Sequence, residues 1–265
     1  MQLGLGIAAG PDPDRFATLA AEAETLGYTS IWSNDSPAGE GLAMLAAWAG
    51  SSTVVDLGVG VMALDRHTPE AIAGRVTELG LAADRLLLGL GAGFNAGPLG
   101  AVREGVAALR ERLPGVRLVV AAMGPKMCAL AGEVADAALL NWMTPDRARL
   151  ARGLVKGGAE ESGRDPGEVT VHGYVRVAMG TDAADRLANE AGFYTQMPHY
   201  ARHFEASGVE PRTIGVAAAD ETALRQALAE YDALDTLVVR VLSEREPAAI
   251  LAVAAAASGG QPAGV

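Results

Sequence analysis

Two glycine-rich stretches stand at the ends of apolar, strand-like runs, and their spacing could place a flat ligand against bare backbone. The first covers residues 57–69 (LGVGVMALDRHTP) and the second covers residues 85–95 (RLLLGLGAGFN). Glycine at such points lets the backbone approach a ligand closely and adopt conformations that other residues resist. The alternative is that each stretch forms an ordinary tight turn. Because two consecutive runs carry the pattern, we expect a ligand with a planar ring system.

Side chains that could transfer protons follow the strand-like runs. Asp65 and His67 follow the first glycine-rich run, and Asp35 follows a short run at residues 30–33. A carboxyl or imidazole group near a substrate can act as a general acid or base. The alternatives are that Asp35 caps a helix opening near Glu40 and that His67 is a hydrogen-bonded surface residue. The sequence has no nucleophile elbow, no Walker-type loop and no cluster at metal-ligand spacing, so we expect no metal.

Length and composition restrict the class of protein. The chain has 265 residues, of which 50% are apolar, and a single (β/α)8 barrel typically needs about 250 residues. The net charge is −11 and the isoelectric point is about 4.8, so we expect no nucleic-acid or membrane partner. The single cysteine, Cys128, can form no internal disulfide, which suits a reducing compartment. With no signal peptide and no membrane-length apolar run, we expect a cytoplasmic protein.

Strand-like runs alternate with helical segments, which is typical of βα units. Helix starts are indicated by a capping residue before proline at Asp12, Thr68, Gly124 and Thr144, and by a capping box at Ser243. A doubly wound sheet would also alternate, but eight units with glycines at strand ends favour a closed (β/α)8 barrel. The eight strand-like runs are residues 2–8, 30–33, 54–62, 85–90, 116–121, 135–141, 169–178 and 236–242.

The segment at residues 187–218 is longer than one connection needs. It is rich in aromatic residues and is interrupted by two prolines, so we predict an elaborated loop and helical region after strand seven. The small, polar residues 258–265 predict a flexible tail. The sequence therefore predicts one barrel domain at residues 1–257, with its functional site at the carboxyl ends of the strands.

The chain resembles the luciferase-like family of flavin- and deazaflavin-dependent oxidoreductases, which are (β/α)8 barrels. The resemblance is carried by residues 57–73 (LGVGVMALDRHTPEAIA), 84–95 (DRLLLGLGAGFN) and 116–145 (VRLVVAAMGPKMCALAGEVADAALLNWMTP). The order and spacing are closest to the branch that resembles methylene-tetrahydromethanopterin reductases, which use the deazaflavin coenzyme F420. Relatives that use FMN share much of the same pattern.

The resemblance implies a cofactor site built from the ends of strands three to six. Deazaflavin enzymes have a bulge with a non-prolyl cis peptide that supports one face of the ring, and Gly60–Val61 matches its position. A polar side chain after strand four would bond the ring edge or ribityl chain. Backbone N–H groups after strand five would bind the phosphate at a helix N-terminus. The expected cofactor-binding residues are Gly60, Val61, Met62, Asn95, Met123, Gly124, Lys126 and Asn141.

The chain departs from the family pattern at two positions. Many deazaflavin members have Asp-His after strand two, where this chain has Asn34 and Asp35, and some relatives have a glutamate where this chain has Ala92. Both changes remove candidate proton donors. Asp35 is then the first candidate for the catalytic acid, and His67 is the second.

The resemblance implies an F420-dependent oxidoreductase that transfers a hydride to or from a small, largely apolar substrate, at a C=C or C=N bond. The alternatives are an FMN-dependent monooxygenase and a flavin-binding barrel without turnover. A homodimer is compatible with the alanine-rich segment 246–257. Aromatic and apolar residues near the strand ends predict a hydrophobic substrate pocket, although such residues can also be core. The expected substrate-contacting residues are Trp32, Phe94, Trp142, Met143, Tyr194 and Tyr200.

Overall fold

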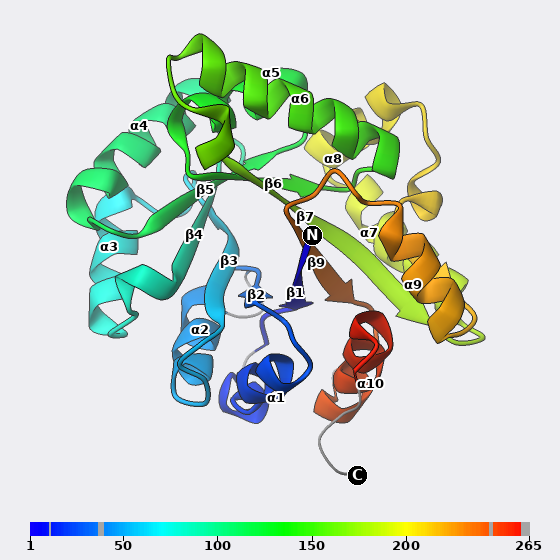
Figure 1. Cartoon of the computed structure of the whole chain (residues 1–265). Coiled ribbons are helices and arrows are strands. Elements are labelled where there is room, and N and C mark those ends of the chain that lie inside the picture. The colour runs from blue at the N-terminus through cyan, green and yellow to red at the C-terminus, as the bar shows by residue number, and fades with distance from the viewer. Residues whose placement is uncertain (11, 37–39, 244–245, 261–265) are drawn as a thin grey trace.

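The protein folds into a closed barrel of eight parallel strands, as the alternating pattern predicts (Figure 1). The structure is a computed structural model that describes residues 1–10, 12–36, 40–243 and 246–260. Each strand pairs in parallel with the next, and β9 closes the barrel by pairing with both β7 and β1. The barrel strands are β1 (Gln2–Ile7), β2 (Ser30–Ser33), β3 (Asp56–Ala63), β4 (Leu86–Gly91), β5 (Arg117–Ala122), β6 (Ala137–Asn141), β7 (Thr170–Met179) and β9 (Thr236–Val241).

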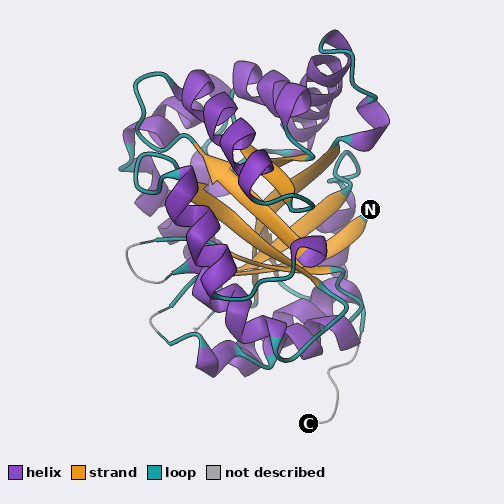
Figure 2. Ribbon diagram, turned by 90° about the vertical axis from the view of Figure 1, so that its left-hand side faces the viewer, coloured by secondary structure: helices purple, strands orange, loops and turns teal. Residues whose placement is uncertain are grey.

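Helices surround the strands, which lie in the middle of the molecule in both views (Figure 1, Figure 2). None of the helices in the described ranges is long and apolar enough to cross a membrane. Of the tail predicted at residues 258–265, Ser258 ends the last helix and residues 261–265 lie outside the described residues. The helices are α1 (Leu19–Thr25), α2 (Gly41–Ala49), α3 (Pro69–Glu78), α4 (Pro98–Arg112), α5 (Pro125–Val134), α6 (Pro145–Glu161), α7 (Ala183–Thr195), α8 (Pro198–Ser207), α9 (Glu221–Ala229) and α10 (Pro247–Ser258).

Proline at the first helical position correctly predicts the starts of α3, α5 and α6. Thr68 and Thr144 cap α3 and α6, because each side chain accepts a hydrogen bond from the backbone N–H three residues later. Two predicted starts are wrong. The chain after Asp12 forms only a 3-10 turn at Asp14–Phe16 before α1 begins. The last helix begins at Pro247, four residues after the expected cap.

The predicted elaborated region after β7 contains α7, α8 and a short additional strand. This strand, β8 (Val216–Ala218), pairs with the last residues of β7, Val177–Met179. Strand β9 pairs with β7 only as far as Val177, so the end of β7 runs beyond its barrel neighbour. The sequence analysis missed β8, because three residues are too few to show an alternating pattern.

Side chains fill the barrel interior. Trp32 is fully buried there, and it fits because β3 carries glycine at position 58: a Cβ atom on Gly58 would lie 2.2 Å from the indole ring. A closely packed interior of this kind leaves no channel through the barrel. The interior cluster consists of Trp32, Leu87, Val119, Ala137, Leu139, Tyr174 and Val238, with Val61 packed against it.

Strand β3 contains the predicted bulge. The register between β3 and β4 shifts between Val59 and Met62, and the Gly60–Val61 peptide bond is cis. The Val61 side chain occupies the space above two glycines of β4: a Cβ atom would lie 2.9 Å from it at Gly89 and 2.7 Å from it at Gly91. The glycines of β4 therefore accommodate the bulge of β3, which gives them a packing role.

Helices α5 and α6 pack with their backbones in contact. A Cβ atom on Gly132 of α5 would lie 1.9 Å from the carbonyl oxygen of Val155, and one on Gly158 of α6 would lie 2.0 Å from that of Ala129. No side chain could be inserted at either point without separating the helices. This contact fixes the position of α5, whose N-terminus follows β5 at the functional end of the barrel.

Candidate functional site

The upper layer of the barrel interior, near the carboxyl ends of the strands, is polar on one side. Side chains alternate along a strand, so the residues two positions beyond Leu139, Tyr174 and Val238 also face inward. These residues are Asn141, Arg176 and Arg240. The opposite wall carries small residues: a Cβ atom on Gly60 would lie 2.6 Å from the Tyr174 ring. The barrel therefore presents two guanidinium groups and an amide at the end where the active sites of (β/α)8 barrels lie.

Arg176 is almost completely buried, with 3% of its surface exposed. Its guanidinium carbon lies 4.1 Å from the centre of the Trp142 ring and 5.0 Å from that of Tyr194. Its terminal Nη1 donates to Asn141 Oδ1, whereas its Nε is buried without a partner. Among the described residues no carboxylate pairs with it. Aromatic rings rather than counter-charges therefore hold this cation.

Helices α7 and α8 cover this layer with aromatic side chains. We call these side chains, Tyr194, Tyr200 and Phe204, the aromatic cover. Tyr200 accepts a hydrogen bond from Asn141 Nδ2 at 3.1 Å, and its ring lies 4.6 Å from that of Tyr194. Burial raises the pKa of Tyr200 to about 12, so its hydroxyl stays protonated at neutral pH. Trp142 follows β6 with a φ of 52°, a left-handed conformation that is uncommon for a non-glycine residue. Its carbonyl oxygen is 2.8 Å from His203 Nε2.

The structure brings the two candidate proton donors, Asp35 and His67, into contact. His67 Nε2 lies 3.0 Å from Asp35 Oδ2, and Arg66 lies 3.3 Å from the same oxygen. The other oxygen, Oδ1, accepts from the Gly41 N–H at the start of α2 at 3.1 Å. The Asp35 side chain is 5% exposed and that of His67 is 31% exposed. The carboxylate thus accepts bonds from several donors, and the imidazole is the more accessible group of the pair.

The loop after β4 is held by Asp65. Its Oδ2 accepts from the Phe94 N–H at 3.0 Å, and a side chain on Gly93, which has a φ of 60°, would collide with the carboxylate. Phe94 is 71% exposed, and its ring packs edge-on against His199 of α8 at 5.3 Å. Asn95 donates to Ala92 O within the loop. The loop therefore connects the end of β4, where we predicted cofactor binding, with α8.

The N-terminus of α5 is open. Gly124 is the N-cap residue, no side chain caps the helix, and a Cβ atom on Gly124 would meet nothing within 4 Å. Lys126 is exposed in the first turn, and Met123 is partly buried beside it. The first-turn N–H groups of a helix attract anions. This geometry is compatible with the predicted phosphate position.

Several expected contact residues are in fact core residues. Trp32 fills the barrel interior, and Met62 and Met143 are buried in the main core between strands and helices. Trp142 is fully buried, and its ring packs on the Arg176 guanidinium group. These four side chains pack the barrel and its helices, as large apolar residues at strand ends often do, and their contacts with cofactor or substrate stay predictions. Phe94, Tyr194 and Tyr200 lie in or next to the aromatic cover.

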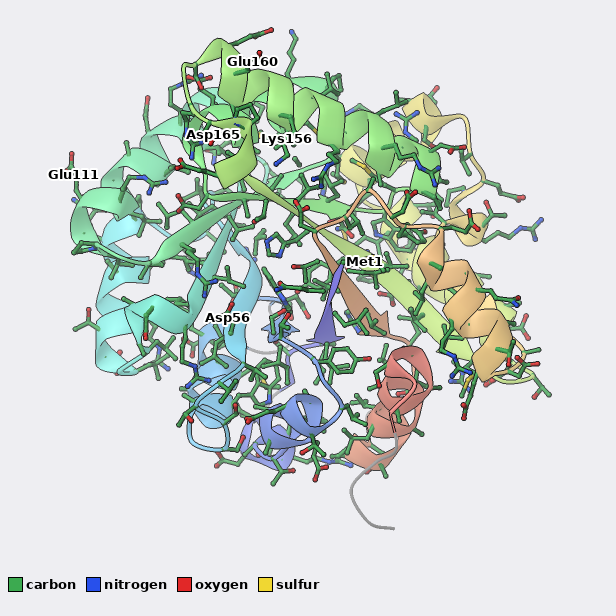
Figure 3. All side chains as sticks on the ribbon, in the orientation of Figure 1. Met1, Asp56, Glu111, Lys156, Glu160 and Asp165 are labelled. Carbon is green, nitrogen blue, oxygen red and sulfur yellow. The ribbon has the colours of Figure 1, made fainter. Side chains whose placement is uncertain are left out.

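Two cavities lie at opposite ends of the barrel. The smaller, about 140 Å³, lies at the carboxyl ends of β1 and β9 and is lined by Gly6, Glu190 and Arg240 among others. The larger, about 730 Å³, lies at the amino ends and includes Met1 and Asp56, which are labelled in Figure 3. Ion pairs such as Arg117 with Asp56 cross that end. In barrels of this kind the amino end serves stability, so the smaller cavity belongs to the candidate site.

The sequence of the chain is similar to those of known proteins. The family model described as luciferase-like monooxygenase matches residues 1–113 and 103–241. The 5,10-methylenetetrahydromethanopterin reductase of Methanolobus tindarius is 29% identical over 205 residues, which are 64% of this chain and only 63% of that protein's length.

Solved structures share the fold over nearly the whole chain. An F420-dependent secondary alcohol dehydrogenase in complex with an F420–acetone adduct has a TM-score of 0.78 at 17% identity and covers 97% of this chain and 98% of its own. The oxygenating constituent of 3,6-diketocamphane monooxygenase from Pseudomonas putida, in complex with FMN, has a TM-score of 0.70 at 16% identity. The match covers 97% of this chain and 96% of that one.

Proposed function

Because the chain belongs to the luciferase-like monooxygenase family, we propose that it is an oxidoreductase that moves a hydride between coenzyme F420 and a small organic substrate. The reaction is the reduction of a C=C or C=N bond or its reverse. Similarity to a methylenetetrahydromethanopterin reductase and to an F420-dependent alcohol dehydrogenase supports this choice of cofactor. When bound, the cofactor supplies the hydride donor or acceptor, and the protein binds, orients and excludes competing reactions.

Unpaired polar atoms at the carboxyl end of the barrel carry the proposal. Within the described ranges, four buried side-chain atoms lack a hydrogen-bond partner, and three of them lie in or beside the aromatic cover: Trp142 Nε1, Arg176 Nε and His199 Nδ1. Each unsatisfied group of this kind costs about 1–3 kcal/mol. A cofactor and a substrate rich in hydrogen-bonding atoms would satisfy them between them, and a deazaflavin or flavin is such a cofactor.

Residues at three strand ends would each bind a different part of the cofactor. The bulge of β3, with Gly60 and Val61, would lie against the ring, and Asn95 of the β4 loop would bond its polar edge. The open first turn of α5, at Gly124, would bind the phosphate with Lys126 as a nearby cation. The packing described above fixes the bulge of β3 against β4 and the position of α5 against α6.

We assign the proton to His67 rather than to Asp35. The imidazole is partly exposed at the carboxyl end of the barrel, and Asp35 is engaged by His67, Arg66 and the Gly41 N–H. A carboxylate in that position orients the imidazole through Nε2. His67 would then give a proton to the substrate atom that becomes electron-rich after hydride transfer, and Asp35 acts through it.

FMN-dependent monooxygenation is the second candidate. The FMN complex of the Pseudomonas putida monooxygenase, which shares the fold, favours it. A flavin-binding barrel without turnover is the third, because the residues that match the usual acids of the family are Asn34, Asp35 and Ala92.

Titration of the purified protein with each cofactor separates these functions. We expect coenzyme F420 to bind at least about tenfold more tightly than FMN, as measured by changes in cofactor absorption and fluorescence, and the reduced form to stay stable in air. Tighter binding of FMN with oxygen consumption would support monooxygenation instead. If F420 binds but single-turnover mixing with unsaturated and imine substrates transfers no hydride, the barrel binds without turnover. Binding of neither cofactor would overturn the proposal.

Lys126→Ala is expected to weaken F420 binding about tenfold, which corresponds to about 1.4 kcal/mol. The lysine is exposed, so its contribution to phosphate binding is that of one screened charge. The measurement is the fluorescence titration at two salt concentrations, and the loss should shrink at the higher one. Arg212→Ala serves as the control, because Arg212 is also exposed and pairs with a carboxylate of its own, that of Glu210. Equal affinities for Lys126→Ala and the control would place the phosphate elsewhere.

A further inference from the structure

Arg176 and Arg240 are neighbours without counter-charges. They are register partners on the paired strands β7 and β9, so their backbones are adjacent and both side chains face the interior. Arg176 donates a hydrogen bond to Asn141 Oδ1, and Arg240 donates one to the Val241 carbonyl oxygen. Within the described residues neither arginine forms an ion pair. Two unpaired cations in a barrel interior are costly unless an anion joins them.

The local electrostatics agree with a missing anion. Burial lowers the pKa of Arg240, and the charge of Arg176 lowers it further, whereas Glu190 of α7 opposes both effects. Glu190 lines the same 140 Å³ cavity as Arg240 but lies beyond ion-pair distance of either arginine. One carboxylate therefore faces two guanidinium groups, and the layer keeps a net positive charge.

The cavity beside Arg240 has room for a small anionic group. Gly6 of β1 contributes no side chain to its wall, and a volume of about 140 Å³ holds several waters or one carboxylate or phosphate group. Arginine's planar fork of N–H donors matches the oxygen atoms of such groups. The cofactor phosphate is not the expected occupant, since its proposed site at α5 follows β5, and β6 and β7 separate β5 from β9.

We infer that Arg176 and Arg240 bind an anionic group, a carboxylate or a phosphate, of the substrate. That the bound group belongs to a substrate rests on the proposed function, but the anion site itself does not require a bound cofactor. It replaces the expectation of a largely apolar substrate: the aromatic residues Trp142 and Tyr194 pack on the Arg176 guanidinium and hold it in place. The substrate is thus an organic acid or phosphate whose reducible bond lies above the arginines.

Anion binding can be measured without cofactor, because Trp142 is a built-in reporter. We expect inorganic phosphate to change tryptophan fluorescence saturably in the cofactor-free protein at constant ionic strength. Arg176→Gln and Arg240→Gln should each weaken phosphate at least about tenfold, Arg176→Lys should lose less, and Arg212→Gln should bind like the wild type. Thermal unfolding of each variant checks that it is folded, and the lysine variant at the same position replaces any glutamine variant that is not.

A matched pair of organic probes tests the substrate class. Crotonate and its neutral methyl ester carry the same C=C bond, and we expect crotonate to compete with phosphate at least about tenfold better than the ester, with no difference between them in Arg176→Gln. Phosphate binding that is equal in the wild type and both glutamine variants would overturn the inference. So would variants that lose F420 affinity while keeping phosphate affinity, since the anion would then be the cofactor's. Failure of the wild type to bind F420, with phosphate binding intact, would overturn the proposed function and leave the anion site standing.

Discussion

His67→Gln is expected to lower kcat about 10²–10⁴-fold while the dissociation constant of the cofactor stays within about twofold. Glutamine keeps a hydrogen-bonding group near Asp35 but cannot give up a proton at neutral pH. The expected loss is that of one general acid, because the hydride step and the binding residues are untouched. The measurements are steady-state kinetics with F420 and the fluorescence titration used for the wild type.

Asp35→Asn distinguishes the orienting carboxylate from the proton donor. Its kcat should fall less than that of His67→Gln with KM little changed, and the double variant should be no slower than His67→Gln alone, because both residues act in one step. Asp232→Asn, at an exposed carboxylate that pairs with Arg149, is the control. A near-normal kcat in His67→Gln with F420 bound would mean that solvent supplies the proton, and a larger loss in Asp35→Asn would return the role to the aspartate.

Gly158→Ala is expected to lower the free energy of unfolding by about 2–3 kcal/mol. A single methyl group would lie 2.0 Å from the Ala129 carbonyl oxygen, and neither backbone can move without separating α5 from α6. The adjacent change Gly157→Ala is the control: nothing lies within 4 Å of its Cβ position, so it should raise the free energy of unfolding by about 0.5–1 kcal/mol. Urea denaturation measures both, and shifts of the same sign would contradict the helix contact.

The barrel was predictable because its signals are local and repeated. Eight apolar runs of the right length, separated by proline-marked helix starts, agree with the eight barrel strands. The bulge at Gly60–Val61 was also predicted correctly, through the family pattern. Strand β8 and the late start of α10 depend on tertiary packing, which one sequence does not show.

The candidate site was less predictable, for two physical reasons. The bulge places both Gly60 and Val61 toward the interior, so Met62 turns outward into the core, and a simple alternating pattern assigns it to the wrong face. The arginines were missed although a signal existed: Arg176 and Arg240 each interrupt an apolar strand in phase with inward-facing residues. Their meaning depends on the absence of nearby carboxylates, which only the three-dimensional arrangement of the described residues reveals.

The contact between Phe94 and His199 links two segments of the candidate site. It joins the β4 loop to α8 through one edge-on ring pair, with Phe94 largely exposed. Such a pair contributes about 0.5–1.5 kcal/mol, which is comparable to thermal energy. Little free energy therefore opposes the separation of these two side chains, while the Asp65 bond to the Phe94 N–H keeps the loop's base in place. An opening at this point would break one side-chain contact and would leave the rest of the fold unchanged.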